Sequence, residues 1–509
     1  MSRSAKFPLL RSLLEAASEA QLSDQQIEQR ISRRSFLKSS AIIAGISAID
    51  FALPPITYSQ RKGKPKIVIV GAGLAGLTAA YELRKRGINA TIYEANNRVG
   101  GRVLTVRDVI APGLVTEYGG EFIDSGHTYM RKLAREFRLP LQDVKSSSRK
   151  SKKELYYFDG RQYSHEDLVN AFKPISVRLT EDVKKVSGAY DRTFARYDMY
   201  TLEQYIWTLD CEEWLKKLLT VAYVTEFGLE ARMQSAVNML SMIDTNVLDK
   251  KLEMFGDSDE RYRIKGGNDL LPKAIAKKLS NSIELGHYLS SIKKSPGEQY
   301  VLEFGVGAES LKQVKADIVL LTIPFSVLRY VETNAFSTEK MQIINALGYG
   351  SNSKIILGMM KDRKKTPWEL TGHSGSMFSD LRAQSGWESA PDHSKTDTSY
   401  TVYLGGKRAD LKQVLAEDVL HDMNTIIPGL DKQLNGTSKS FAWQDYKYAN
   451  GSYSAYSAGE WSFQGLEGKP EGDCYFAGEH CSKDSQGFME GAVETGVVAA
   501  KQILSKVMR

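Results

Sequence analysis

A glycine-rich turn followed by an acidic residue is the strongest chemical signal in the sequence. Gly71, Gly73 and Gly76 form a G-x-G-x-x-G pattern, and Glu94 follows after a short interval. Gly71 permits a tight turn, Gly73 lets the backbone approach a pyrophosphate, and Gly76 lets a helix pack closely on a strand. Glu94 can accept hydrogen bonds from ribose hydroxyls. The pattern therefore predicts a dinucleotide-binding site.

The flanking residues indicate the elements that position these glycines. Residues 66–70 (KIVIV) are typical of a strand buried on both faces of a parallel sheet. A helical pattern covers residues 77–85, and a second strand is expected over residues 90–93, directly before Glu94. The order strand, glycine turn, helix, strand and acid predicts a Rossmann-like unit whose helix N-terminus offers N–H groups to phosphates. The fingerprint alone does not choose between NAD and FAD.

Two further segments with paired glycines follow this unit. Residues 95–103 read ANNRVGGRV, and residues 117–123 read EYGGEFI. They resemble the G-G-R-V and E-x-G-G segments of the flavin-containing amine oxidase family, which wrap the pyrophosphate and approach the flavin. Together with the fingerprint, the resemblance implies FAD contacts from Leu74, Ala75, Ala95, Arg98, Gly100, Gly101, Arg102, Gly119, Gly120 and Glu121.

The resemblance returns near the C-terminus. Residues 475–480 (YFAGEH) and 486–496 (QGFMEGAVETG) look like the family's F-A-G-E block and the block that begins its last helix. In the family this helix N-terminus points at the pyrimidine edge of the flavin, where its dipole stabilises an anionic reduced ring. The resemblance adds cofactor contacts from Trp443, Gly478, Glu479, Gly487, Phe488, Met489 and Ala492.

The resemblance also implies three catalytic positions. Tyr453 and Phe488 would be the two aromatic walls that flank the substrate amine, although Phe488 stands where the family has tyrosine. Lys354 leads into an apolar strand, and its amine would hold a water molecule next to flavin N5. Ser452 occupies the place of the cysteine that carries covalent flavin in the animal monoamine oxidases, so FAD is expected to bind non-covalently.

The expected fold class is α/β, with a discontinuous Rossmann-like FAD-binding domain interleaved with a mixed α+β substrate-binding domain. The FAD-binding domain is assigned to residues 66–130, 255–330 and 445–509. The substrate-binding domain is assigned to residues 131–254 and 331–444, where helical periodicity is rich between residues 166 and 252.

Residues 1–60 are predicted to be a twin-arginine signal peptide and linker. The string SRRSFLK at residues 32–38 precedes an uncharged stretch at residues 39–49, which is too short to span a bilayer. This predicts export to the periplasm or medium of a bacterium and no stable membrane span. Without residues 1–65 the chain keeps 58 basic and 56 acidic residues, so its formal charge falls from +7 to +2. Composition thus gives no support for nucleic-acid binding.

The three cysteines, Cys211, Cys474 and Cys481, form no C-x-x-C pair, and the seven histidines lack metal-ligand spacing. No metal is therefore expected, and a homodimer stays possible.

The predicted function is that of an FAD-dependent oxidase for an L-amino acid or an amine. Hydride transfer to flavin N5 would give an imine that water hydrolyses to a keto acid or aldehyde and ammonia, while O2 is reduced to H2O2. The sequence around residues 119–124 and the leader favour an L-amino acid, and amines are the close second. A flavin desaturase or porphyrinogen-type oxidase acting on C–C bonds, and a non-catalytic FAD-binding protein, remain alternatives.

Overall fold

A five-stranded parallel sheet forms the base of the molecule in the computed structural model, which describes residues 65–144, 153–243, 254–255, 258–307, 310–362, 365–389 and 396–508. Its strand order is β20-β13-β1-β2-β9, and every neighbouring pair is parallel. The strands come from three distant parts of the chain: β1 (Ile67–Val70), β2 (Ala90–Tyr93), β9 (Ile283–Glu284), β13 (Ile318–Leu321) and β20 (Cys474–Phe476). The predicted signal peptide lies outside the described residues.

Both faces of β1 are buried, as its sequence predicts, because alternate side chains enter two separate cores. Ile67 and Ile69 pack against helices on one face, and Val68 and Val70 pack against a second sheet on the other. The helices are α3 (Leu74–Arg84), α4 (Thr128–Glu136), α10 (Leu270–Lys278) and α15 (Met489–Val507). The second sheet contains β10 (His287–Lys293), β11 (Tyr300–Val306), β12 (Ser310–Ala316) and β14 (Glu332–Thr333), with α11 (Phe325–Leu328) and α12 (Thr338–Ala346) nearby.

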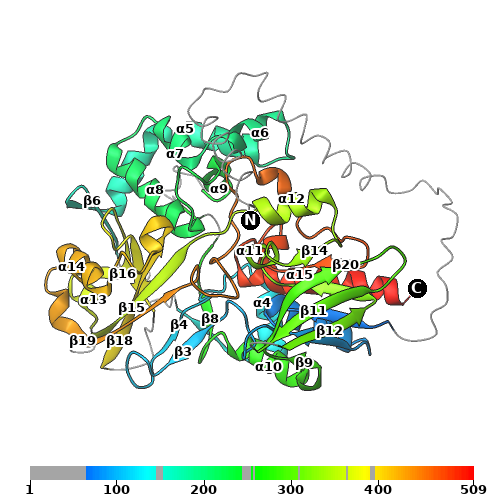
Figure 1. Ribbon diagram of the computed structural model, residues 1–509. Coiled ribbons are helices and arrows are strands. Elements are labelled where there is room, and N and C mark those ends of the chain that lie inside the picture. Colours follow the sequence, from blue (N-terminus) through cyan, green and yellow to red (C-terminus); the bar gives the residue numbers. More distant parts are fainter. Residues whose placement is uncertain are drawn as a thin grey trace.

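A seven-stranded sheet of order β19-β15-β18-β17-β16-β6-β7 lies beside this base (Figure 1). Its strands are β6 (Lys153–Phe158), β7 (Arg161–Tyr163), β15 (Asn352–Met360), β16 (His373–Ser379), β17 (Ser385–Glu388), β18 (Asp397–Gly405) and β19 (Leu434–Ala442). The helices α13 (Pro367–Leu370) and α14 (Ala416–Ile426) contribute to a core on this sheet. β15 is central to the site, because it pairs on both edges and carries Lys354.

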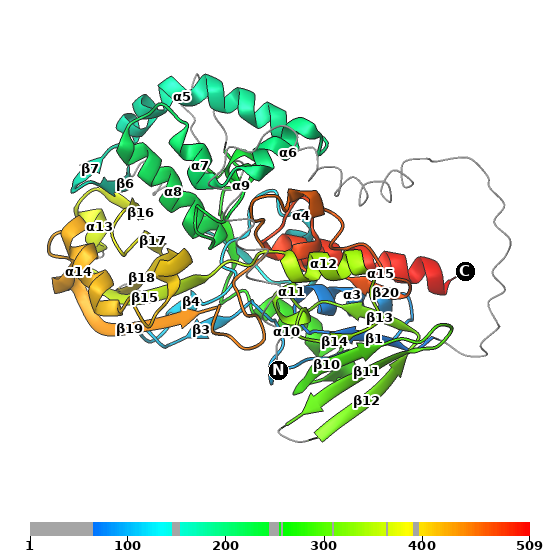
Figure 2. The same cartoon turned by 45° about the horizontal axis from the view of Figure 1, so that its top comes forward.

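A group of helices lies above the seven-stranded sheet, as Figure 2 shows. It contains α5 (His165–Val186), α6 (Arg192–Met199), α7 (Leu202–Trp207), α8 (Glu213–Phe227) and α9 (Ala236–Leu240). Their apolar faces share one core, which explains the periodicity seen in the sequence. Gly228 ends α8 in the left-handed conformation that favours glycine at a helix C-terminus. None of the helices in the described ranges is both long and apolar enough to span a membrane.

Two small antiparallel ribbons complete the fold: β3 (Thr105–Arg107) with β4 (Val115–Glu117), and β5 (Leu141–Asp143) with β8 (Tyr262–Ile264). The chain thus has a mixed α/β fold with parallel and antiparallel sheets. Helix α3 begins at Leu74, earlier than the expected residue 77, because the second half of the glycine pattern forms its first turn. The domain boundaries assigned from the sequence stay a prediction.

Candidate active site

A cavity of about 720 Å³ lies between the parallel sheet and the seven-stranded sheet, within the range of about 300–1,000 Å³ usual for ligand sites. It gathers most of the residues selected from the sequence. Those lining it are Gly71, Gly73, Leu74, Ala75, Glu94, Ala95, Gly100, Gly101, Arg102, Gly119, Gly120, Glu121, Lys354, Trp443, Tyr453, Gly478, Glu479, Gly487, Phe488, Met489 and Ala492. Gly76 and Arg98 are not among the lining residues.

The glycine turn after β1 forms a cradle at one end of the cavity. Gly71 has φ of +104°, and a Cβ on Gly76 would lie 2.1 Å from the Gly71 carbonyl oxygen, so the start of α3 touches the turn. A Cβ on Gly73 would instead meet no atom within 4 Å. No side chain caps α3, which leaves the N–H groups of its first turn beside the cavity. This arrangement fits a bound diphosphate.

Glu94 and Arg98 shape the same end of the cavity. The Glu94 carboxylate accepts hydrogen bonds from the backbone N–H of Ala72 at 2.7 Å and of Asn96 at 2.9 Å. Burial raises the pKa of Glu94, although these bonds oppose the rise. Each oxygen retains a lone pair for a ribose hydroxyl. Arg98 donates to the Gly101 carbonyl at 2.7 Å, so it holds the loop that carries a cavity wall.

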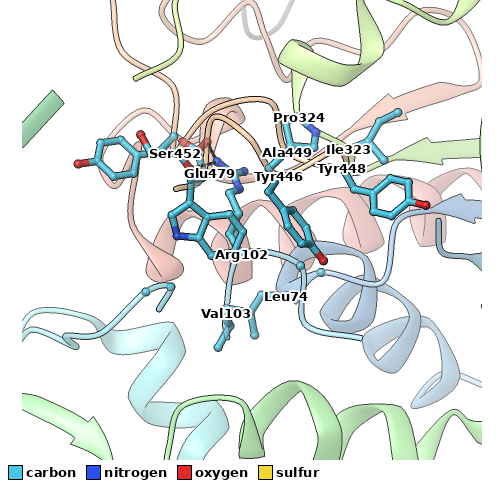
Figure 3. Close-up of a pocket in the computed structure, with 18 of the residues that line it drawn as sticks. Leu74, Arg102, Val103, Ile323, Pro324, Tyr446, Tyr448, Ala449, Ser452 and Glu479 are labelled. Carbon is cyan, nitrogen blue, oxygen red and sulfur yellow. Dashed lines mark hydrogen bonds and ion pairs between the residues drawn. The ribbon is translucent and has the colours of Figure 1, made fainter. Parts of the chain in front are cut away.

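A partly buried ion pair joins the N-terminal and C-terminal parts of the site (Figure 3). Arg102 donates to Glu479 Oε1 at 2.8 Å and to the Ser452 carbonyl at 2.9 Å. The other Glu479 oxygen accepts from the Ser454 hydroxyl at 2.7 Å and from the Gly487 N–H at 2.8 Å. Burial disfavours the charged carboxylate, but Arg102 and these bonds outweigh it and lower the pKa of Glu479. The pair therefore fixes together two loops that line the cavity.

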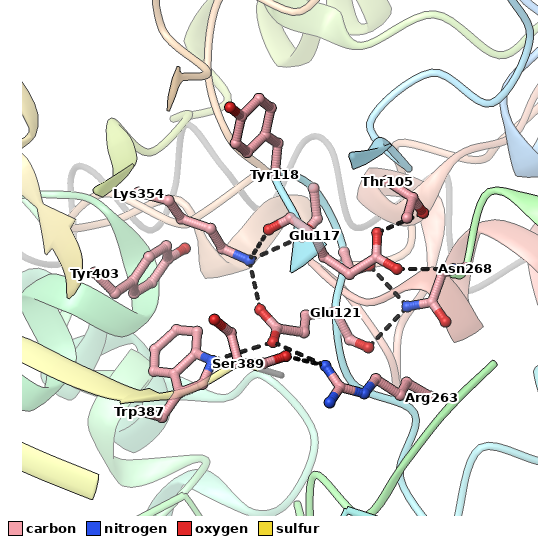
Figure 4. A network of polar contacts seen from close by, with 12 residues as sticks. Thr105, Glu117, Tyr118, Glu121, Arg263, Asn268, Lys354, Trp387, Ser389 and Tyr403 are labelled. Atoms are coloured by element: carbon pink, nitrogen blue, oxygen red, sulfur yellow. Dashed lines mark hydrogen bonds and ion pairs between the residues drawn. The ribbon is translucent and has the colours of Figure 1, made fainter. Parts of the chain in front are cut away.

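Lys354 is held by three acceptors, as Figure 4 shows. Its Nζ donates to the carbonyl oxygens of Glu117 at 3.0 Å and Gly119 at 3.1 Å, and to Glu121 Oε2 at 2.8 Å. The side chain is buried. An ammonium group has three N–H donors, so all of them are used here. A bond to a water molecule, the role expected from the sequence, requires one of these contacts to be exchanged.

Glu121 connects Lys354 to residues that the sequence reasoning missed. Its Oε1 accepts from the Trp387 indole N–H at 3.2 Å and lies 3.8 Å from Arg263, which is also buried. Asn268 donates from its side-chain amide to the Glu121 carbonyl at 2.7 Å. In the sequence, only Glu121 could have indicated these residues, because a carboxylate that becomes buried requires hydrogen-bond or charge partners.

Aromatic residues line the part of the cavity beyond Lys354. Tyr453 donates a hydrogen bond to the backbone carbonyl of Glu226, and its hydroxyl lies 3.0 Å from that of Tyr403. The Tyr403 and Trp387 rings are 5.4 Å apart. Phe488 precedes α15, and a Cβ on the neighbouring Gly487 would lie 3.6 Å from the Tyr453 ring. The structure thus brings Tyr453 and Phe488 to one cavity and adds Trp387 and Tyr403.

No cysteine lines the cavity, and the residue before Tyr453 is engaged elsewhere: Ser452 donates from its hydroxyl to Asn352 Oδ1 at 2.6 Å. All three cysteines are free thiols. Within the described residues, no group of histidine, cysteine and acidic side chains is arranged to hold a metal ion.

Comparison with known proteins gives a family and several relatives. The family described as flavin containing amine oxidoreductase matches residues 74–504. The flavin-dependent L-tryptophan oxidase RebO of Lentzea aerocolonigenes is 26% identical over 494 residues, covering 87% of this chain and 99% of the relative. The L-amino-acid oxidase of Pseudechis australis is 25% identical over 476 residues, covering 87% and 88%. Cyclohexylamine oxidase from Brevibacterium oxydans IH-35A has a TM-score of 0.75 at 19% identity, covering 88% of this chain and 100% of that structure.

These findings confirm the resemblance seen in the sequence. The structural likeness shows a shared mixed α/β fold, and the family match extends over most of the chain, from the start of α3 into α15. The expected cofactor is confirmed as a flavin and the expected enzyme class as an oxidoreductase acting on amines. The chain belongs to the flavin-containing amine oxidoreductase family.

Proposed function

We propose that this protein is an FAD-dependent oxidase that deaminates an L-amino acid or an amine. The observation that carries the proposal is the single cavity in which the glycine cradle, the Lys354 network and the aromatic wall meet. The L-amino-acid and L-tryptophan oxidases among the relatives support an amino acid, and the cyclohexylamine oxidase supports an amine.

The glycine turn and the start of α3 are suited to bind the FAD diphosphate. Glu94 is suited to bind its ribose. The uncapped start of α15 lies at the cavity through Met489 and Ala492, where it favours negative charge on the flavin ring. When bound, FAD would accept a hydride equivalent from the substrate α-carbon and pass the two electrons to O2, which gives H2O2. No thiol lines the cavity to form a thioether with the flavin, so we expect FAD to be held without a covalent bond.

The chain's own residues orient the substrate and exclude water. Tyr453 and Phe488 flank the amine, and Trp387 and Tyr403 extend this wall, so the reacting carbon lies in an apolar environment. Lys354 positions the water used for imine hydrolysis or reoxidation. Its three present acceptors keep the ammonium fixed at the cavity wall until such a water replaces one of them.

Release of H2O2 from a panel of L-amino acids and amines tests the proposal. The FAD-loaded protein should consume O2 with at least one of them and release ammonia in equal amount. A yellow, FAD-loaded protein that gives no peroxide with any of them would contradict the oxidase assignment and favour a non-catalytic flavoprotein. Oxidation of a substrate at a C–C bond, without ammonia, would favour the desaturase or porphyrinogen-type alternative.

We also propose export by the twin-arginine route, which rests on residues 32–49 of the sequence alone. Replacement of Arg33 and Arg34 by lysine should retain the protein in the bacterial cytoplasm, as measured by cell fractionation. Unchanged export of that variant would contradict the proposal.

A further inference from the structure

A carboxyl group without a partner lines the substrate end of the cavity. Glu226 lies in the last turn of α8, and its backbone carbonyl accepts the hydrogen bond from Tyr453, which places it next to the aromatic wall. Within the described part of the chain, its carboxyl group forms no hydrogen bond and no ion pair. The charged groups that shift the pKa of the Glu226 carboxyl are two other acidic residues.

These two acids, Glu260 and Asp124, line the cavity as well. Burial, followed by the charges of Glu260 and Asp124, raises the pKa of Glu226 to about 8. Asp124 is engaged in the loop: it accepts from the Glu260 N–H at 2.7 Å and the Ser258 hydroxyl at 2.8 Å, and lies 3.4 Å from His127. The Tyr403 and Tyr453 hydroxyls complete this region. The substrate end is therefore acidic.

The cations that line the cavity are engaged elsewhere. Arg102 is paired with Glu479, and Lys354 with Glu121. Lys447 lies over the rings of two tyrosines, at 5.4 and 5.6 Å. Among the described lining residues, no lysine or arginine is left to neutralise Glu226.

Glu226 is half-buried and lines the cavity. A carboxyl group with a purely structural role would generally be hydrogen-bonded within the protein. Glu226 also faces two acids that make its ionisation more costly. Both conditions are relieved by one change, the arrival of a ligand that donates hydrogen bonds and carries positive charge. Aromatic side chains beside the carboxyl would add favourable cation–π contacts.

We propose that the substrate carries a second cationic group, away from the reacting amine, and that Glu226 binds it with support from Glu260. This inference rests on the proposed oxidase function and narrows its substrate class to compounds with an amine to be oxidised and a distal ammonium or guanidinium group. A dibasic L-amino acid and a diamine share this chemistry. The aromatic wall then separates the reacting end of the substrate from its cationic end.

Matched pairs of substrates test the proposal with the FAD-loaded enzyme. L-Lysine is compared with L-norleucine, and putrescine with butylamine, because each pair differs mainly in the distal cation. The kcat/KM of the cationic member should be higher by about tenfold or more, and Glu226→Gln should lower it by about 10- to 100-fold, the range for a charged hydrogen bond. The neutral member should change by less than about threefold.

The control variant is Glu213→Gln, which removes an exposed carboxylate from the first turn of the same helix. It should leave both members of each pair unchanged. Preference for the cation in the first pair identifies a dibasic amino acid, and in the second pair a diamine. Oxidation of neutral substrates with no cation preference, or a preference that survives Glu226→Gln, would overturn the inference and leave the oxidase function intact.

Failure to oxidise any compound would instead contradict the proposed function. Equilibrium dialysis then decides the inference separately, because it measures retention of each compound without turnover. Tighter retention of the cationic member that is lost in Glu226→Gln would support the site. Equal retention of both members would overturn it.

Discussion

Replacing Lys354 with methionine removes one cation from a buried network while keeping a side chain of similar length. Two carbonyl oxygens, of Glu117 and Gly119, lose their donor, and Glu121 loses its contact at 2.8 Å. Glu121 keeps the Trp387 N–H at 3.2 Å and Arg263 at 3.8 Å. The variant therefore leaves a buried carboxylate that is only partly compensated.

Removal of one partner from a buried ion pair costs about 3–5 kcal/mol, because the remaining charge stays buried. Since Arg263 still lies near Glu121, we expect the free energy of unfolding to fall by about 3 kcal/mol, the lower end of this range. Adding Glu121→Gln removes the carboxylate as well, which leaves the buried Arg263 without the anion that lies 3.8 Å from it. The double variant is thus expected to be less stable than Lys354→Met alone.

Urea unfolding of the FAD-loaded enzyme, followed by flavin fluorescence, measures these differences. Lys293→Met serves as the control, because its pair with Glu332 has a similar separation of 2.9 Å but is exposed, and it should leave stability unchanged. Stopped-flow reoxidation by O2 provides the functional readout. Lys354→Met should retain FAD and reoxidise more slowly by about tenfold or more.

Three outcomes would refute the reasoning. A free energy of unfolding equal to that of the unmodified enzyme would mean that the ion pair between Lys354 and Glu121 does not stabilise the protein. A double variant as stable as Lys354→Met, or more stable, would mean that Arg263 and Glu121 do not compensate each other's charge. Reoxidation at the original rate would contradict the role of Lys354 in positioning water.

Other predictions concern the cofactor cradle, the linkage to flavin and pH. Gly76→Ala should destabilise the protein with and without FAD, because its Cβ would meet the Gly71 carbonyl, whereas Gly73→Ala should keep the apo-protein's unfolding temperature and weaken FAD binding; differential scanning fluorimetry with added FAD separates the two. Acid precipitation should release all flavin into the supernatant, and flavin retained in the pellet would contradict non-covalent binding. The kcat/KM ratio of L-lysine to L-norleucine should fall as pH drops below about 8, because Glu226 becomes neutral; a ratio independent of pH between 6 and 9 would contradict its assigned charge.

Local signals in the sequence predicted the elements at the glycine-turn end of the cavity. A β-branched run, a glycine pattern and an acid after the next strand are set by neighbouring residues, and the structure has β1, α3 and β2 in that order. Tyr453 and Phe488 were identified by resemblance to a family, because nothing in their own spacing distinguishes them from core aromatic residues. Both line the cavity.

The substrate end could not be predicted in the same way. Glu226 lies on α8, Arg263 on β8, Trp387 on β17 and Tyr403 on β18, so their meeting depends on long-range packing. Trp387 and Tyr403 enter through the register in which β17 pairs with β18, and no short sequence pattern fixes that register. In the sequence, nothing distinguishes Glu226 from an ordinary polar residue near the end of an amphipathic helix.

The edge strand β20 and the helix α15 have a consequence for the order of events during synthesis. Both lie between residues 474 and 507, yet β20 pairs with β13 and α15 packs against α3, the helix that follows the glycine turn. A growing chain that has not yet reached these elements lacks one wall of the cavity. Flavin loading must therefore follow synthesis of residues 474–507. Loading before export then requires transport of a folded protein, which is the task of the twin-arginine route proposed above.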